Sequence, residues 1–394
     1  MRNPFEYGGV VGADAFCNRS DELKFLTRAI ENVQTVFMYS ERRMGKSSLV
    51  KQVLSNLDKH LFVPAYVDLW STDSAESFAL SFARGLTEAS THTVEKMLLF
   101  AKERFPYLVP TAGLDDSGRP KISFTLSARD VSKPNLAQVL EAPQRLAERT
   151  QKTVVMVLDE FQQILEYEND LVERQLRSSI QHQRNVAYIF LGSRKHLIQK
   201  MVIDKTRPFY RSGPHFPLGP IGTEHWEPFI KARFERFGKL ISQPQINWIC
   251  QLSEGHPFYT QHLCHALWEL AEPGHPMSED LLRAALELLL KQEDYAYSVL
   301  WQSLGLNQRR MLQGLAWEGS GATEPFSSAF VHTYGLRTAS NVQRAIESLL
   351  PKDVIDQEGG RYFILDRFFK LWIVNLMSGT MGHRTPLPDT LEPQ

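Results

Sequence analysis

Four short apolar segments alternate with amphipathic patterns in the first half of the chain. They lie at residues 35–39, 62–69, 154–158 and 186–191. Strands that are buried on both faces read as continuous apolar runs, and their alternation with helices is typical of a parallel sheet covered on both sides. Residues 46–60 follow the first segment with apolar side chains at helical spacing. The pattern therefore predicts an α/β fold in which a strand leads through a tight loop into a helix.

The second half of the chain has the pattern of helices. From residue 221 to about residue 292, apolar positions recur at helical spacing. Three short helical patterns and two strand-like runs follow, and this is the element order of a winged helix. The helices are predicted at 308–317, 327–334 and 340–350, and the strands at 353–356 and 362–365.

These patterns divide the chain into four predicted segments. Within the first, residues 106–134 are rich in Pro and Gly and contain an alternating run that predicts an inserted hairpin, whose function the sequence does not reveal. The four segments are an α/β domain at 1–220, a helical domain at 221–292, a winged helix at 293–376 and a flexible tail at 377–394.

The charge balance excludes a globally basic or acidic protein. The 394 residues carry 44 Lys plus Arg against 45 Asp plus Glu, a formal net charge of -1, so any charged partner must be met locally. No apolar run approaches the roughly 20 residues that cross a bilayer. The three cysteines, Cys17, Cys250 and Cys264, lack the spacing of a disulfide framework. We therefore expect a cytoplasmic protein without a membrane partner.

The decisive chemical signal lies at residues 36–48, where an apolar strand passes through a loop into a helix. A polyphosphate needs inward backbone N–H groups, a mobile cation and a hydroxyl that joins the shell of Mg²⁺. Lys46 supplies the cation and Ser47 the hydroxyl, while Gly45 lets the backbone approach the phosphates. The other loop residues that we predict to bind nucleotide are Ser40, Arg43, Met44 and Ser48.

One position departs from the phosphate-loop pattern G-x-x-x-x-G-K-[ST]. Ser40 stands where that pattern has its first glycine, and serine fits there only if its φ stays negative. A Gly-Lys-Ser tripeptide alone is most often an accidental surface turn. Its position between an apolar strand and an amphipathic helix favours a phosphate loop instead.

A second signal is the apolar strand at residues 153–158, which ends in Asp159 and Glu160. We expect Asp159 to hold Mg²⁺ together with Ser47, and Glu160 to orient and deprotonate the attacking water. Strands that end in an acid are common, but a phosphate loop upstream favours the functional interpretation.

A third strand, at residues 188–192, is followed by Ser193 and Arg194. Ser193 is a candidate hydrogen-bond partner of the water or the γ-phosphate, and Arg194 a candidate for the charge that develops on that phosphate. The alternative for Arg194 is an arginine that reaches into solvent at a strand end.

Taken together, these motifs resemble the archaeal-type P-loop ATPases, which are relatives of the STAND and AAA+ families and of origin-recognition ATPases. The resemblance also covers residues 3–11, 207–210, 255–259 and 366–372. It implies an AAA+/STAND-like P-loop NTPase sheet at 1–220, a helical lid at 221–292 and a C-terminal winged helix, with ATP and Mg²⁺ as cofactors.

The resemblance further implies which residues neighbour the base. Val10, Val11 and Arg19 precede the first strand and are expected beside the adenine or ribose. The equal alternative is an N-terminal segment that only packs on the sheet. Pro257 in the implied lid is expected beside the adenine, and its alternative is a proline that only starts a helix.

The predicted winged helix offers few cations. The outward residues of its third helix are Asn341, Gln343, Arg344, Glu347 and Ser348, a nearly neutral face. Phosphate neutralisation supplies much of the affinity for nucleic acid, so this face predicts weak or assisted DNA binding. A brace or protein contact surface is the favoured interpretation.

We therefore expect an ATP-binding, slowly ATP-hydrolysing switch that exchanges ATP and ADP and regulates a partner protein, its own assembly or a DNA transaction. Two alternatives stay open. One is a DNA-binding ATPase that resembles origin-recognition or transposition-associated proteins, and the other is a nucleotide-sensing scaffold with negligible hydrolysis.

Overall fold

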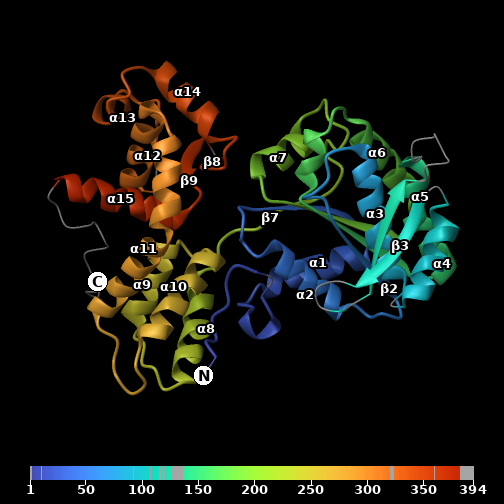
Figure 1. The fold of residues 1–394 in the computed structure, drawn as a ribbon, viewed down its shortest axis with the longest axis horizontal. Helices are drawn as coiled ribbons and strands as arrows, with labels where there is room; N and C mark the ends of the chain where they lie inside the picture. Colours follow the sequence, from blue (N-terminus) through green and yellow to red (C-terminus); the bar gives the residue numbers. More distant parts are fainter. Residues whose placement is uncertain are drawn as a thin grey trace. The chain divides into compact units, whose positions relative to one another are not determined.

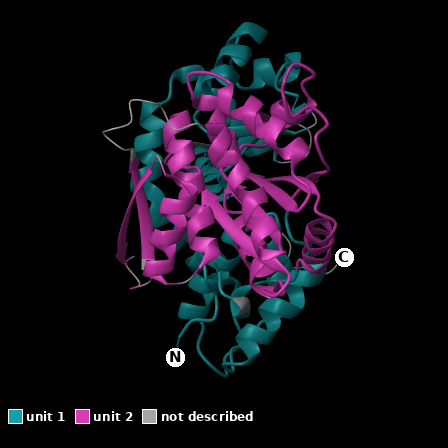
Figure 2. Ribbon diagram, turned by 90° about the vertical axis from the view of Figure 1, so that its right-hand side faces the viewer, with its two compact units in different colours: residues 1–18, 220–394 teal, residues 19–219 magenta. Residues whose placement is uncertain are grey.

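The computed structural model describes residues 2–9, 11–91, 93–106, 108–114, 118, 120–126, 136–319, 324–358 and 360–381. The chain forms two compact units, and Figure 2 draws them in different colours. One unit is Arg19–Gly219, and the other combines Met1–Asn18 with Pro220–Gln394.

The unit 19–219 is built on a five-stranded sheet in which every neighbouring pair of strands is parallel. The strand order is β2-β5-β6-β1-β7. The apolar runs read from the sequence become its strands: β1, β5 and β6 are buried on both faces, whereas the side chains of β2 alternate between buried and half-buried. The strands are β1 (Thr35–Tyr39), β2 (Phe62–Asp68), β5 (Thr153–Asp159), β6 (Val186–Gly192) and β7 (His215–Pro217).

Helices cover this sheet (Figure 1). α1 packs against α2, while α3, α5 and α6 contribute to one apolar cluster with alternate side chains of the strands, such as Phe37 and Phe190. The side chains between them, such as Met38, are buried outside that cluster. The helices are α1 (Ser20–Glu31), α2 (Lys46–Asn56), α3 (Ala75–Ser90), α4 (Val94–Arg104), α5 (Leu136–Thr150), α6 (Leu171–His182) and α7 (Lys195–Ile203), with a 3-10 helix η2 (Phe161–Glu166).

The predicted insertion contains a hairpin. β3 (Leu108–Leu114) and β4 (Pro120–Leu126) pair antiparallel, and Ile122 and Phe124 are buried in the core of the unit. The last part of the insertion, residues 127–134, lies outside the described residues.

The second unit is helical apart from one small hairpin. Its core runs from Trp226 through Leu263 to Phe368 without interruption. The elements are α8 (Thr223–Glu235), α9 (Gln243–Ser253), α10 (Pro257–Leu270), α11 (Glu279–Ser303), α12 (Leu306–Glu318), α13 (Ser328–Thr333), α14 (Ala339–Leu349), β8 (Ile355–Glu358), β9 (Arg361–Ile364) and α15 (Arg367–Met381), preceded by a 3-10 helix η1 (Ala13–Ala15). Helices α12, α13 and α14 with the β8–β9 hairpin have the order predicted for the winged helix.

Three features differ from the segments expected from sequence. Residues 1–18 join the C-terminal unit because Phe5 and Cys17 are buried in its core. Helix α11 runs continuously across the expected boundary between residues 292 and 293. Helix α15 continues to Met381 and buries Met377, so the expected flexible tail begins inside a helix, and residues 382–394 lie outside the described part.

Across the described ranges, the helices are all too short or too polar to span a bilayer.

Candidate functional site

The loop between β1 and α2 is the first component of the site. Gly45 caps α2 with a φ of 89°, a left-handed conformation that costs a glycine little. Arg43 also has a positive φ, whereas Ser40 is not among the described residues with one. Serine therefore occupies the first pattern position without backbone strain, as the sequence required. Ser40, Met44 and Ser48 are buried and Arg43 is exposed.

The ammonium group of Lys46 points back into this loop. Its Nζ donates to Ser40 Oγ at 2.8 Å and to the carbonyl of Glu41 at 3.0 Å. Lys46 is only 5% exposed. Burial lowers its pKa to about 8, and the nearby carboxylates of Glu160, Asp159 and Glu41 act in the opposite direction. A buried cation held by one hydroxyl and one carbonyl can exchange these acceptors for phosphate oxygens.

The end of β5 provides the second component. Ser47 Oγ donates to Asp159 Oδ2 at 2.8 Å, so the predicted hydroxyl and carboxylate lie together. The hydroxyl of Tyr66 on β2 donates to the same oxygen, and burial followed by the Asp159 charge raises the pKa of this phenol. Within the described residues no group of three or more His, Cys, Asp or Glu is placed to hold a metal ion. One carboxylate and one hydroxyl suit Mg²⁺, which takes few protein ligands and completes its shell with water and phosphate oxygens.

The next residue, Glu160, takes part in a small polar network with two other side chains. Its backbone is left-handed, with a φ of 54°. Its Oε2 accepts a hydrogen bond from Ser193 Oγ at 2.7 Å and another from Gln162 Nε2. Gln162 Nε2 also lies 3.3 Å from Ser193 Oγ, while its Oε1 is buried without a partner. Left-handed non-glycine residues are costly and cluster at functional sites.

Arg194 and Lys195 follow directly after Ser193. Arg194 pairs with Glu166 of η2 at 2.8 Å. Lys195 lies 3.8 Å from Glu41 of the phosphate loop, and both side chains are 8% exposed. The ion pair therefore connects the start of α7 to the phosphate loop.

Sequence reasoning missed four residues of this site: Tyr66, Gln162, Glu41 and Lys195. Tyr66 is one of several alternating residues of its strand, and Gln162 carries no motif. Glu41 and Lys195 are far apart in sequence, so only the folded chain brings them together.

Two sequence families match the chain. A model described as an ATPase domain predominantly from Archaea matches residues 16–263, well over half of the protein. The chain is a member of this archaeal ATPase family. A second model, a probable winged helix domain, matches residues 295–375. No curated protein sequence matches the chain.

Solved structures of similar fold agree with this assignment. The Walker-type ATPase PABY2304 of Pyrococcus abyssi is 15% identical with a TM-score of 0.62, and the match covers 92% of this chain and 97% of that one. The ORC2 protein of Aeropyrum pernix, in ADPNP and ADP complexes, is 14% identical with a TM-score of 0.53, covering 92% and 95%. At these identities the likeness establishes the fold: a P-loop ATPase sheet with a C-terminal winged helix.

The residues expected near the base of this archaeal ATPase are distributed over both units. Arg19 belongs to the unit 19–219, where its guanidinium donates to Glu22 at 2.9 Å and to the carbonyl of Gly219 at 2.7 Å. Pro257 is the first residue of α10 in the other unit. Val10 lies outside the described residues.

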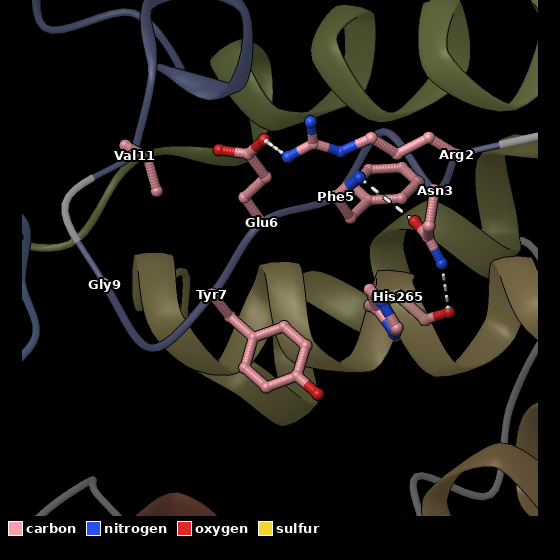
Figure 3. Close-up of a pocket in the computed structure, with 8 residues that line it drawn as sticks. All are labelled: Arg2, Asn3, Phe5, Glu6, Tyr7, Gly9, Val11 and His265. Atoms are coloured by element: carbon pink, nitrogen blue, oxygen red, sulfur yellow. Dashed lines mark hydrogen bonds and ion pairs between the residues drawn. The ribbon is translucent and has the colours of Figure 1, made fainter. Parts of the chain in front are cut away.

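Val11 lines a cavity of about 380 Å³ in the N-terminal segment (Figure 3). Arg2 pairs with Glu6 at 3.1 Å there, and Asn3 donates to the carbonyl of His265 at 3.1 Å. The contacts that surround this cavity hold the N-terminal segment on α10.

Proposed function

We propose that this archaeal ATPase is a molecular switch that binds ATP with Mg²⁺, hydrolyses it slowly and changes state between its ATP and ADP forms. Lys46 and the loop amides of residues 40–48 hold the phosphates. Ser47 and Asp159 hold the metal ion, Glu160 holds the water, and Ser193 with Arg194 responds to the γ-phosphate.

One observation carries this proposal: a buried ammonium, a hydroxyl–carboxylate pair and a second carboxylate converge at one edge of the sheet. Lys46 interacts electrostatically with both Asp159 and Glu160, and Ser47 contacts Asp159 directly. A buried cation surrounded by acids and polar oxygens suits a ligand that carries both phosphate charge and a divalent ion. When bound, Mg²⁺ would neutralise charge on the β- and γ-phosphates.

The role of Glu160 follows from its hydrogen bonds. Ser193 and Gln162 both donate to Oε2, which leaves Oε1 as the oxygen to accept a proton from water. These two donors hold the carboxylate in one orientation and occupy one of its two oxygens, and this partial occupation is our physical reason for proposing slow turnover.

The switching role rests on two ion pairs, one made by Arg194 and the other by Glu41. Arg194 is paired with Glu166, and Lys195 with Glu41. A γ-phosphate would compete with these carboxylates for the cations, and ADP would not. A ligand shifts a conformational equilibrium only by its difference in affinity for the two states. Competition for these cations would give ATP, but not ADP, such a difference in affinity.

Val10, Val11, Arg19 and Pro257 remain our proposed neighbours of the base. The regulated output is a partner protein, self-assembly or a DNA transaction. We propose a cytoplasmic location because ATP and Mg²⁺ are abundant there and the spacing of the three cysteines is not that of a disulfide framework. Gel filtration with ATP, ADP and no nucleotide tests self-assembly.

The test of catalysis is the substitution Glu160→Gln. It keeps the shape of the side chain and removes the base, so we expect hydrolysis to fall by about 10²–10⁴-fold while ATP affinity stays within about threefold. The matched control is Glu148→Gln, an exposed glutamate of α5 whose side chain accepts a hydrogen bond from Gln144 at 2.8 Å.

A nucleotide-sensing scaffold with negligible hydrolysis is the second candidate. It is favoured by the hydrogen bonds from Ser193 and Gln162 that already occupy Glu160. If the wild-type protein and Glu160→Gln both bind ATP and hydrolyse it at the same rate, the scaffold proposal is correct and the ATPase proposal is wrong.

A further inference from the structure

The winged-helix part of the chain has a cavity of about 430 Å³ at the first turns of α12 and α14. Three arginines contribute to its wall: Arg310 from α12, Arg337 from the loop between α13 and α14, and Arg344 from α14. The other lining residues are Gly305, Leu306, Asn307, Gln308, Asn341 and Ala345. No acidic residue is among them.

The three guanidinium groups retain most of their hydrogen-bonding capacity. Arg310 uses one nitrogen to donate to the carbonyl of Gly335 at 2.7 Å. Arg337 and Arg344 are exposed. In the described part of the chain, none of the three forms an ion pair with a carboxylate.

The acidic residue closest in sequence to Arg344 does not line this cavity. Glu347 is the single acidic residue of α14, one turn after Arg344; it does not line the cavity, and it accepts a hydrogen bond from Gln343 at 2.8 Å. The outer face of α14 is nearly neutral when read alone. The fold changes this balance because Arg310, from a different helix, adds its charge beside Arg337 and Arg344.

Uncompensated like charges in one cavity repel one another, and this repulsion is relieved when an anion binds among them. Each guanidinium presents a planar fork of donors that matches two oxygens of a phosphate. The amides of Asn341 and Asn307 add neutral donors to the same wall.

We propose that this cavity is a phosphate-binding site, separate in sequence from the phosphate loop at residues 40–48. Its ligand is a phosphate group, carried either by a nucleic-acid backbone or by a free phosphate compound. Contacts to phosphate carry no sequence information, so recognition of a nucleic acid through this site would be independent of its sequence.

The inference is tested with the double variant Arg337→Gln/Arg344→Gln in the full chain. Both side chains are exposed, so we expect the melting temperature and the affinity for ATP to stay unchanged. The matched control is Arg283→Gln, which removes an exposed arginine of α11 outside the cavity.

Two arms distinguish the source of the phosphate. The first measures fluorescence anisotropy of labelled 30-nucleotide single strands and 30-base-pair duplexes at 50 and 200 mM KCl. The second measures binding of inorganic phosphate by calorimetry in the Lys46→Ala background, in which phosphate binding by the phosphate loop is weakened. We expect the double variant to weaken binding at least about tenfold, and to lower the salt slope for an oligonucleotide by about 2 because two phosphate contacts are lost.

Loss of binding in the oligonucleotide arm identifies a nucleic-acid backbone, and loss in the phosphate arm alone identifies a free phosphate compound. The inference is wrong if neither probe binds at millimolar concentration, or if the double variant and Arg283→Gln bind as the wild type does. Either of these results would favour a brace or protein contact surface. Both leave the ATP-switch proposal intact, because that proposal is tested at Lys46 and Glu160.

Discussion

Lys46 in the phosphate loop and the three arginines of the winged-helix cavity present cations in opposite ways. Lys46 is buried, and its charge is balanced by neighbouring acids and internal acceptors. Arg337 and Arg344 are exposed, and no acid lines their cavity. A buried cation in a low-dielectric site binds strongly and is screened little by salt, whereas exposed cations bind weakly and in a salt-dependent way. We infer that the first arrangement suits one small ligand, and the second suits a polyanion or a transient partner.

The comparison predicts its largest effect at Lys46. Lys46→Ala should weaken ATP binding by about 100-fold or more, because it removes a desolvated charge-assisted contact worth roughly 3 kcal/mol. Calorimetry measures the affinity, and circular dichroism verifies the fold. The control is Lys24→Ala, an exposed lysine 3.5 Å from Asp21. An ATP affinity unchanged by Lys46→Ala in a folded protein would contradict the phosphate-loop assignment.

The pKa of Lys46 predicts the next effect. With this pKa lowered to about 8, the lysine loses its charge as the pH rises through that value, so ATP affinity should fall by about tenfold per pH unit above it. The exposed arginines and the phosphodiesters of an oligonucleotide keep their charge, so oligonucleotide binding by the winged-helix cavity should change little over the same range. Titrations between about pH 7 and 9.5 make the measurement. If the affinities of both sites changed equally with pH, the proposed difference between a buried lysine and exposed arginines would be wrong.

The same pKa shift acts on folding with the opposite sign. The pKa of Lys46 is lower in the folded protein than the ordinary value of 10.5, so the unfolded chain binds more protons between about pH 8 and 10.5. This lysine therefore makes the nucleotide-free protein more stable as the pH rises through that window. The free energy of unfolding of Lys46→Ala, measured in denaturant at several pH values, should lack this rise with pH.

The smallest effects concern the two ends of the phosphate loop. Gly45→Ala forces an alanine into a φ of 89° and should cost about 1–2 kcal/mol of stability, although a Cβ there would meet no atom within 4 Å. Ser40→Gly restores the usual pattern and should change stability by less than about 1 kcal/mol, because Ser40 has no positive φ to relieve. Thermal unfolding compares the pair. If both variants lost the same stability, the positive φ of Gly45 would not be what limits the residue type in this loop.

Much of the nucleotide-binding fold could be predicted from the chain alone. The apolar segment at 35–39 coincides with β1. The segments predicted for β2 and β6 differ from those strands by one residue at one end, and the segment predicted for β5 differs by one residue at each end. The short edge strand β7 was missed, because a strand of three residues with one half-buried side chain gives no periodic signal. The place of residues 1–18 was also missed, because local patterns contain no information about which core buries Phe5.

The candidate site was predicted in its parts, and its internal contacts were not. Asp159 and Glu160 could be found because acids directly after a buried strand are conspicuous. Tyr66, Gln162 and the pair Glu41–Lys195 could not, because each is ordinary in its own segment and gains its role only from a neighbour distant in sequence. The same holds for Arg310, whose charge joins α14 only in the folded chain.

By itself, then, the sequence determined which chemical groups stand at the ends of the buried strands, because apolar periodicity and glycine, lysine and acid positions are local properties. Tertiary structure alone decided which of those groups meet. The order β5-β6-β1 brings the ends of three parallel strands to one edge, so that Ser193 reaches Glu160 and Ser47 reaches Asp159. Strand order and helix packing result from the burial of side chains distant in sequence, and no local pattern contains that information.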